Sequence, residues 1–226
     1  PDQFDTAEPP WPRPYALFVG TVEARKNHLL ALRAWQSLIE RHGADHVPDL
    51  VCIGRLGWHS AEFLREYVTT RGLGGKVSVL SSSVTDAELA RFYAHADFTV
   101  YPSRYEGWGL PVSESLAFGR LPVVAYNSSL PEAGRDLAAY FRTDDVDDLV
   151  HVVEEQALDP DHRRAHEARI AADTAEPITW EHVAAVIEHE VMNAAEAEGR
   201  KPVYPTIELG REYMLAVGEP PPDTGY

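Results

Sequence analysis

The stretch Glu106-Gly-Trp-Gly-Leu-Pro-Val-Ser-Glu114 follows the apolar run Phe98–Tyr101 and joins a predicted strand to a predicted helix. Gly107 and Gly109 allow backbone conformations and close approaches that a side chain would block. Pro111 suits the first turn of a helix, where its missing N–H costs no hydrogen bond. The N–H groups at a helix start lack partners and carry partial positive charge, so they favour a phosphate. The two glutamates add acceptors for sugar hydroxyls, and the stretch therefore predicts a nucleotide-sugar site.

The chain around this stretch alternates short apolar runs with helical patterns. Besides the run quoted above, strands are predicted at residues 15–19, 50–53, 77–80, 122–126 and 139–142. Helices are predicted at residues 28–42, 60–71, 85–95, 110–118, 131–134 and 180–198, with surface helices at 147–159 and 161–173. Thr85 and Glu88 form the pattern of a capping box. Because the strands are continuous apolar runs, the sequence predicts an α/β fold with a doubly wound, Rossmann-like parallel sheet.

Two further segments follow predicted strands, so we expect them at the same edge of the sheet. Residues 20–27, Gly-Thr-Val-Glu-Ala-Arg-Lys-Asn, place Arg25 and Lys26 just before a helix, where two cations would neutralise a diphosphate. Residues 127–132 offer the hydroxyl and N–H groups of Ser128 and Ser129. Taken separately, a solvated basic pair and a plain serine N-cap would explain these segments. Their expected convergence with the two glutamates favours one site for a nucleotide-sugar.

Composition argues against several classes of partner. The formal net charge of −16 argues against nucleic acid and against an anionic membrane surface. The single cysteine, Cys52, lies in an apolar run and is predicted to be a buried strand residue. A chain with one cysteine forms no internal disulfide, so we expect a reducing, cytoplasmic compartment. No apolar run approaches the roughly 18 residues of a transmembrane segment, and the scattered histidines predict no metal site.

The two ends of the chain differ in composition from its middle. Residues 1–14 hold five prolines and are predicted to be an interdomain linker. Residues 15–198 form the predicted donor-binding domain, and residues 199–226, which lack a helical period, are predicted to be an extended or disordered tail. The first residue is proline, which fits a fragment of a longer chain.

The chain resembles the C-terminal, nucleotide-binding domain of retaining glycosyltransferases with the GT-B fold, in their large family 4. The resemblance rests on residues 18–27, on residues 84–93 (Val-Thr-Asp-Ala-Glu-Leu-Ala-Arg-Phe-Tyr) and on residues 102–117, which contain the glutamate pair. It implies one half of a GT-B architecture that takes a nucleoside-diphosphate sugar as donor substrate and needs no separate cofactor. It also implies a glycan or lipid-linked acceptor, held by an N-terminal acceptor domain in cis or in trans.

The resemblance implies a role for each matching residue. Glu106 would face the transferred sugar, and Arg25 and Lys26 would bind its phosphates, so these three are the predicted catalytic residues. Glu114 would accept hydrogen bonds from the donor ribose. The remaining predicted substrate-binding residues are Thr21, Val84, Asp86, Gly107, Trp108, Gly109, Leu110, Ser128 and Ser129. On this division of roles, Glu106→Ala is expected to leave nucleoside diphosphate affinity nearly intact.

Three positions depart from the family pattern, namely Thr21, where many members carry arginine, and Ser81 and Arg135. Residues 54–58 look most like bacterial polysaccharide mannosyl- and rhamnosyltransferases. Two alternatives remain open, a non-catalytic nucleotide-sugar binding or regulatory module and a GT-B-type sugar-nucleotide epimerase. The spacing of the two glutamates favours transfer over epimerisation. Without an acceptor domain, the chain alone is expected to transfer no sugar.

Overall fold

The computed structural model describes residues 4–173 and 180–196. Its six strands form one parallel sheet in the order β3-β2-β1-β4-β5-β6. The strands are β1 (Tyr15–Val19), β2 (Asp49–Ile53), β3 (Val77–Leu80), β4 (Phe98–Tyr101), β5 (Pro122–Ala125) and β6 (Ala139–Phe141). The order reverses between β1 and β4, and such a switch point is where open α/β sheets bind ligands. The predicted doubly wound, Rossmann-like fold is confirmed.

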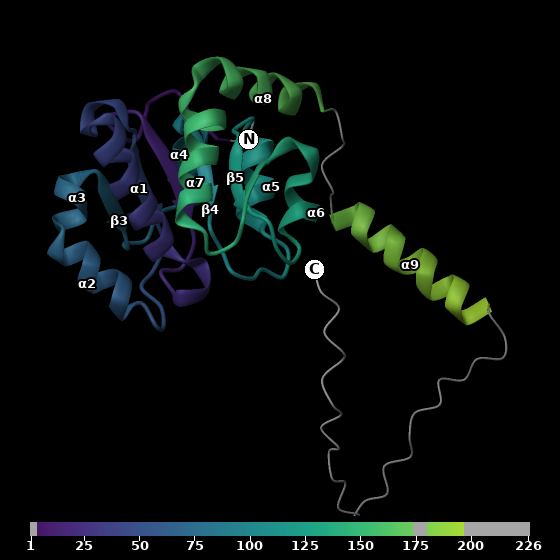
Figure 1. Ribbon diagram of the computed structural model, residues 1–226. Helices are drawn as coiled ribbons and strands as arrows, with labels where there is room; N and C mark the ends of the chain where they lie inside the picture. The colour runs from purple at the N-terminus through teal and green to yellow at the C-terminus, as the bar shows by residue number, and fades with distance from the viewer. Residues whose placement is uncertain (1–3, 174–179, 197–226) are drawn as a thin grey trace, which may run out of the picture. The chain divides into compact units, whose positions relative to one another are not determined.

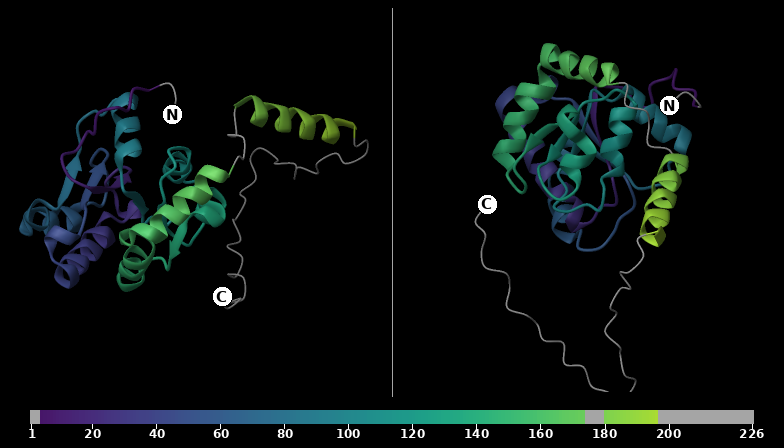
Figure 2. Two further views of the ribbon diagram at one scale, coloured as in Figure 1. Left: turned by 90° about the horizontal axis from the view of Figure 1, so that it is seen from above. Right: turned by 90° about the vertical axis from the view of Figure 1, so that its right-hand side faces the viewer.

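Helices lie on both faces of this sheet (Figures 1 and 2). The helices within residues 4–173 are α1 (His28–His42), α2 (Ala61–Thr69), α3 (Arg71–Gly75), α4 (Asp86–His95), α5 (Leu110–Ala117), α6 (Leu130–Gly134), α7 (Val146–Val152) and α8 (Pro160–Ala172), and a further helix, α9, spans Trp180–Glu196. Short 3-10 turns form at Ala24–Lys26, Ala44–His46 and Arg135–Leu137, and a π-helix at Val153–Leu158. Helices α1 and α7 lie side by side over one face, and α4 packs on the other.

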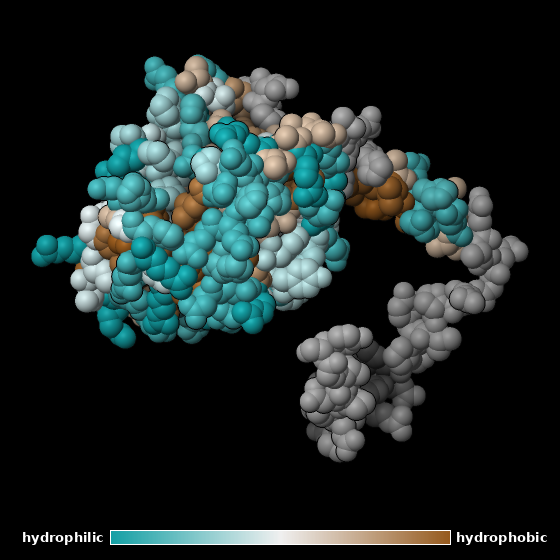
Figure 3. All heavy atoms as spheres, turned by 45° about the horizontal axis from the view of Figure 1, so that its top comes forward, coloured by the Kyte–Doolittle hydropathy of each residue, from teal (hydrophilic) through white to brown (hydrophobic). Residues whose placement is uncertain are grey.

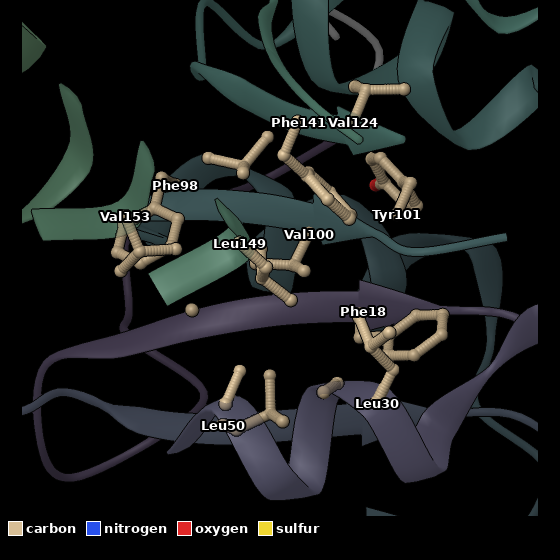
Figure 4. Packing of buried hydrophobic residues seen from close by; sticks show 14 of the residues in the cluster. Phe18, Leu30, Leu50, Phe98, Val100, Tyr101, Val124, Phe141, Leu149 and Val153 are labelled. Atoms are coloured by element: carbon tan, nitrogen blue, oxygen red, sulfur yellow. The ribbon is translucent and has the colours of Figure 1, made fainter. Parts of the chain in front are cut away.

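The largest core cluster lies between the sheet and the pair α1 and α7. Figure 4 shows Phe18 of β1 and Val100 of β4 among Leu30 of α1 and Leu149 of α7. The helix predicted at residues 147–159 corresponds to α7 and the π-helix, with Leu149 buried on its inner face and Asp147 and Glu155 exposed on its outer face. Its acidic residues lie on the outer face of an amphipathic surface helix.

Several local predictions are confirmed. The Thr85 hydroxyl accepts the Glu88 N–H at 3.2 Å, and a Glu88 carboxylate oxygen accepts the Thr85 N–H at 2.8 Å, which completes the capping box. Cys52 is a buried strand residue with 1% of its surface exposed. The helix predicted over residues 60–71 ends earlier, at Thr69, because left-handed backbone conformations begin at Arg71.

The two ends of the described chain also carry structure. Residues 4–14 contain no helix or strand, yet the Trp11 indole N–H donates to Asp49 Oδ2 at 2.9 Å and Arg13 Nε donates to the same oxygen at 2.8 Å. Their role as a linker stays a prediction. Helix α9 belongs to a second compact unit, residues 175–226, and the predicted tail at 199–226 lies outside the described residues.

Most of the surface that faces the viewer in Figure 3 is hydrophilic, as expected for a chain with a formal net charge of −16. None of the helices within residues 4–173 and 180–196 combines the length and the apolar character that crossing a membrane requires.

Candidate functional site

Two basic side chains and one carboxylate meet at the carboxyl edge of the sheet. Lys26 Nζ lies 2.6 Å from Glu106 Oε1, and Arg25 Nη1 lies 2.7 Å from Glu106 Oε2. Arg25 and Lys26 belong to the 3-10 turn that follows β1, whereas Glu106 belongs to the loop that follows β4. Adjacent parallel strands β1 and β4 deliver the two loops to one place. The expected convergence of the basic pair with the glutamate stretch is thus present in the fold.

The charges of this cluster balance one another. Burial alone would raise the pKa of Glu106, but hydrogen bonds from Lys26, Ser103 and Arg25 outweigh it and hold that pKa below its usual value. Burial would lower the pKa of Arg25, but hydrogen bonds and charge from Glu106, together with Glu23 at 2.8 Å, raise it. At neutral pH both cations are therefore already paired with carboxylates. A diphosphate that binds to Arg25 and Lys26 therefore has to displace the Glu106 carboxylate from them.

A second network, of hydrogen bonds, holds the 3-10 turn Ala24–Lys26, here called the basic turn, in place. The Arg104 backbone N–H donates to the Arg25 carbonyl at 2.9 Å, and Arg104 Nη1 donates to the Ala24 carbonyl at 3.0 Å. Asp144 Oδ1 accepts both Arg104 Nε and the Asn27 side-chain amide, each at 2.8 Å. These hydrogen bonds were not predicted from the sequence. Asp144 is 117 residues from Asn27 in the chain, and no local pattern links them.

Ser128 and Ser129 hold the backbone of Glu106. The Glu106 N–H donates to Ser128 Oγ at 3.1 Å, and Ser129 Oγ donates to the Glu106 carbonyl at 2.9 Å. Both serines had been predicted to offer hydroxyls to a substrate. In this structure those hydroxyls position the loop that carries Glu106, and a contact with substrate stays a prediction.

Gly107 and Gly109, the two glycines of the glutamate stretch, have different structural roles. Gly109 has a φ of +98°, and a Cβ added there would lie 2.8 Å from Leu130 Cδ2, so the fold itself requires glycine at this position. At Gly107 a Cβ would enter open space, with no atom within 4 Å. Leu110 is exposed, and the indole N–H of Trp108, also exposed, donates to Ser113 Oγ at 3.1 Å. The open backbone at Gly107 leaves room for a ligand to approach.

Glu114 has a hydrogen-bond partner on another helix that the sequence did not predict. The Tyr93 hydroxyl, on α4, donates to Glu114 Oε2, on α5, at 2.7 Å. Tyr93 is 1% exposed, whereas Glu114 is half-buried. Tyr93 belongs to a segment that carries the family resemblance. Its contact with Glu114 nevertheless depends on how α4 and α5 pack, which no local spacing reveals.

An open hollow of about 300 Å³ lies beside the basic turn. Its lining comes from the carboxyl ends of β1 and β2 and the loop after β3, and includes Gly20, Thr21, Gly54, Arg55, Ser83 and Val84. The Lys26 side chain runs past Gly20, whose added Cβ would lie 3.4 Å from Lys26 Cδ. Thr21 and Val84, both predicted substrate-binding residues, thus share one hollow. Asp86, also predicted, is the exposed first residue of α4, and Arg55 is a lining residue that the prediction omitted.

His28 anchors the helix that follows the basic turn. Its ring stacks on Phe18, with ring centroids 4.0 Å apart, and 2% of its surface is exposed. Burial, with a smaller contribution from the charge of Lys26, lowers the pKa of His28 to about 3. The imidazole is therefore neutral in the folded protein at every pH at which the protein would normally be handled.

We expect this buried histidine to make the fold sensitive to acid. An unfolded histidine titrates near pH 6.5, so between that pH and about 3 the unfolded state binds one more proton than the folded state. Stability then falls by up to about 1.4 kcal/mol for each pH unit of acidification. His28→Phe removes this contribution, and urea unfolding between pH 7 and pH 4.5 measures the change in slope. The exposed His46, replaced by phenylalanine, is the control. Equal slopes for wild type and His28→Phe would contradict a buried neutral imidazole.

Comparison with known proteins places the chain among glycosyltransferases. Residues 2–171 match the family model described as glycosyl transferases group 1. The O-antigen chain mannosyltransferase B of Escherichia coli is 36% identical over 168 residues, which are 74% of this chain and 42% of that protein. The D-inositol 3-phosphate glycosyltransferase of Thermobifida fusca is 33% identical over 125 residues, 53% of this chain and 28% of that protein. The chain thus spans less than half the length of these curated relatives.

Solved structures share the fold at low sequence identity. The α,α-trehalose 6-phosphate synthase of Burkholderia multivorans superimposes with a TM-score of 0.66 and 16% identity, over 84% of this chain and 45% of that one. A trehalose-6-phosphate enzyme from E. coli, solved with UDP-2-fluoro glucose, gives a TM-score of 0.60 and 14% identity over 70% of this chain and 39% of that one. Both likenesses concern the Rossmann-like fold found in GT-B glycosyltransferases.

Proposed function

The chain belongs to the glycosyl transferases group 1 family, and we propose that it is the donor-binding half of a retaining enzyme. The donor is a nucleoside-diphosphate sugar, and the acceptor is a glycan or a lipid-linked glycan in bacterial polysaccharide assembly. The observation that carries this proposal is the meeting of Lys26 and Arg25 with Glu106 between β1 and β4, with a hollow nearby at the carboxyl ends of β1 and β2. A diphosphate needs two cations, and the hollow leaves room for the nucleoside beside them.

The donor then lies across the carboxyl edge of the sheet. Its base enters the hollow lined by Thr21 and Val84, and its ribose hydroxyls donate to Glu114. Its diphosphate binds Arg25, Lys26 and the backbone N–H groups at the start of α5, where the helix dipole favours an anion. The sugar lies near Glu106. Each part of the donor thus meets a group of matching chemistry.

Catalysis by this half consists of stabilising the leaving group. When the bond between the sugar and the diphosphate breaks, negative charge develops on the departing phosphate oxygen. Lys26 is 13% exposed at its side chain, so its charge acts in a poorly hydrated place, where it stabilises that oxygen more strongly than it would in water. The sugar keeps its anomeric configuration, as the family resemblance implies.

The names of the relatives favour mannose as the transferred sugar, because one protein similar to this chain is described as an O-antigen chain mannosyltransferase and three as serotype-specific mannosyltransferases. The acceptor is held by an N-terminal domain, in cis or in trans, that forms the opposite wall of the cleft. Transfer needs both substrates positioned in a water-poor site. The donor half by itself therefore binds the nucleotide-sugar but transfers no sugar to an acceptor.

Calorimetric titration tests the proposal directly. We expect GDP, UDP or dTDP, alone or as sugar conjugates, to bind the chain and to raise its melting temperature. Gly107→Ala is the matched variant, because its added methyl meets no atom of the protein and leaves the fold unchanged. It should weaken donor binding, since the methyl occupies the space through which the ligand approaches.

The proposal fails if none of the nucleotides gives heat or a thermal shift. Turnover of donor only after an N-terminal domain is supplied would separate half an enzyme from a binding module.

A further inference from the structure

The hydroxyls of Tyr101 and Tyr93 and the carboxylate of Glu114 are linked in series by hydrogen bonds. The Tyr101 hydroxyl, on β4, lies 3.4 Å from the Tyr93 oxygen, and the Tyr93 hydroxyl donates to Glu114 Oε2 at 2.7 Å. A phenol has one O–H to donate. Because Tyr93 gives its proton to Glu114, its oxygen faces Tyr101 as an acceptor. The ring of Phe118 stacks on that of Tyr93, with centroids 5.4 Å apart. Both the position and the direction of the Tyr93 donor are thereby set.

Another tyrosine of the same cluster shows what a purely structural hydroxyl does. Tyr15 is as buried as Tyr93, and its hydroxyl donates to the Phe92 backbone carbonyl at 2.7 Å. That bond satisfies a buried polar group and reaches no site. The Tyr93 hydroxyl instead ends on a half-buried carboxylate on α5. Burial also raises the pKa of Tyr93 well above its usual value, so the phenol stays a neutral donor.

A fixed carboxylate binds a diol better than a mobile one. A glutamate side chain that is ordered only when its ligand arrives gives up rotamer entropy at that moment. Oε2 is already held by Tyr93, so the carboxylate meets its ligand in one orientation. The bond to a neutral phenol also leaves the negative charge on Glu114, which keeps it a strong acceptor.

We propose that Tyr93 is a positioning residue that orients Glu114 for the vicinal hydroxyls of a ribose, with Tyr101 supporting it from below. This inference rests on the proposed function, because it takes a nucleoside diphosphate as the ligand. It adds a recognition element that touches no part of the donor. Through Glu114, Tyr93 affects recognition of the ribose and has no effect on binding of the base or of the phosphates.

The test compares Tyr93→Phe with Tyr15→Phe, each of which removes one buried hydroxyl from the same cluster. Both variants and the wild type are titrated with GDP and with 2′,3′-dideoxy-GDP, or with the same pair on the base that the wild type prefers. Tyr93→Phe should weaken binding of the ribose nucleotide roughly tenfold, as expected for a hydrogen bond to a charged group. The dideoxy nucleotide should bind both proteins equally, and Tyr15→Phe should change neither ligand.

The outcomes distinguish a failure of the positioning role of Tyr93 from a failure of the proposed function. Equal weakening of both nucleotides by Tyr93→Phe, or no weakening of either, would overturn the positioning role. A wild type that binds neither nucleotide would overturn the proposed function, and this inference with it. If Tyr93→Phe does not fold, Tyr101→Phe serves instead, with a smaller loss of about two- to threefold that is again confined to the ribose nucleotide. An equal effect of Tyr101→Phe on both ligands would likewise refute the proposal.

Discussion

Replacing Glu114 with alanine is expected to weaken nucleoside diphosphate binding by about a hundredfold or more. Two ribose hydroxyls lose a charged acceptor, and each such hydrogen bond contributes roughly 1.5–3 kcal/mol when it is well made. The sum, about 3–6 kcal/mol, corresponds to at least two powers of ten in affinity. The Tyr93 hydroxyl loses its acceptor as well, so we expect the melting temperature to fall. Isothermal titration at a temperature where the variant is folded measures the affinity.

Glu114→Gln and inorganic diphosphate make this experiment specific. The glutamine keeps an acceptor for Tyr93 and one for ribose but carries no charge, so its affinity should lie between those of wild type and Glu114→Ala. Inorganic diphosphate, which has no ribose, should bind all three proteins equally. A parallel loss of diphosphate binding would mean that Glu114 acts on the phosphate site and not on the ribose.

Glu106→Gln is expected to tighten nucleoside diphosphate binding while it impairs sugar transfer by the complete enzyme. The Glu106 carboxylate occupies both Lys26 and Arg25, at 2.6 and 2.7 Å, so a diphosphate competes with it for the same cations. Removing one unit of negative charge a few ångströms from the diphosphate relieves about 3–4 kcal/mol of repulsion at an effective dielectric constant of about 20. Arg25 is partly exposed and solvent screens it, so we expect about 1–2 kcal/mol, or roughly five- to thirtyfold.

This expectation differs from the one based on the sequence, which assigned Glu106 to the sugar and predicted little change in diphosphate affinity. The ion pairs were invisible in the sequence. Glu23→Gln provides the control, because Glu23 pairs with Arg25 at 2.8 Å and is not within ion-pair distance of Lys26 in the described structure. It should give a smaller gain. Weaker diphosphate binding by Glu106→Gln would show that this carboxylate organises the cations and does not compete for them. All titrations need one ionic strength, since salt screens these charges.

Much of the fold was predictable because its strands are short, wholly apolar and separated by recognisable helix signals. The strand at residues 15–19 has the predicted bounds, and the capping box of Thr85 and Glu88 opens its helix as expected. The convergence of Arg25, Lys26 and Glu106 was predictable for a different reason. Parallel strands place all their carboxyl ends at one edge, so loops distant in the sequence meet there. The sequence predicted a surface helix at 147–159, but only the structure shows that its inner face, with Leu149, completes the core.

The amino-acid sequence by itself determined the alternation of strands and helices, the edge at which the chemistry gathers and the residue types gathered there. These properties depend on local periodicity and on topology, which a single chain displays. Only the tertiary structure decided which groups touch. It paired Glu106 with both cations, placed the Ser128 and Ser129 hydroxyls on the Glu106 backbone and put the Tyr93 hydroxyl on Glu114. Such contacts depend on how helices and loops pack to within a few tenths of an ångström, and hydrogen bonds form or fail over that range.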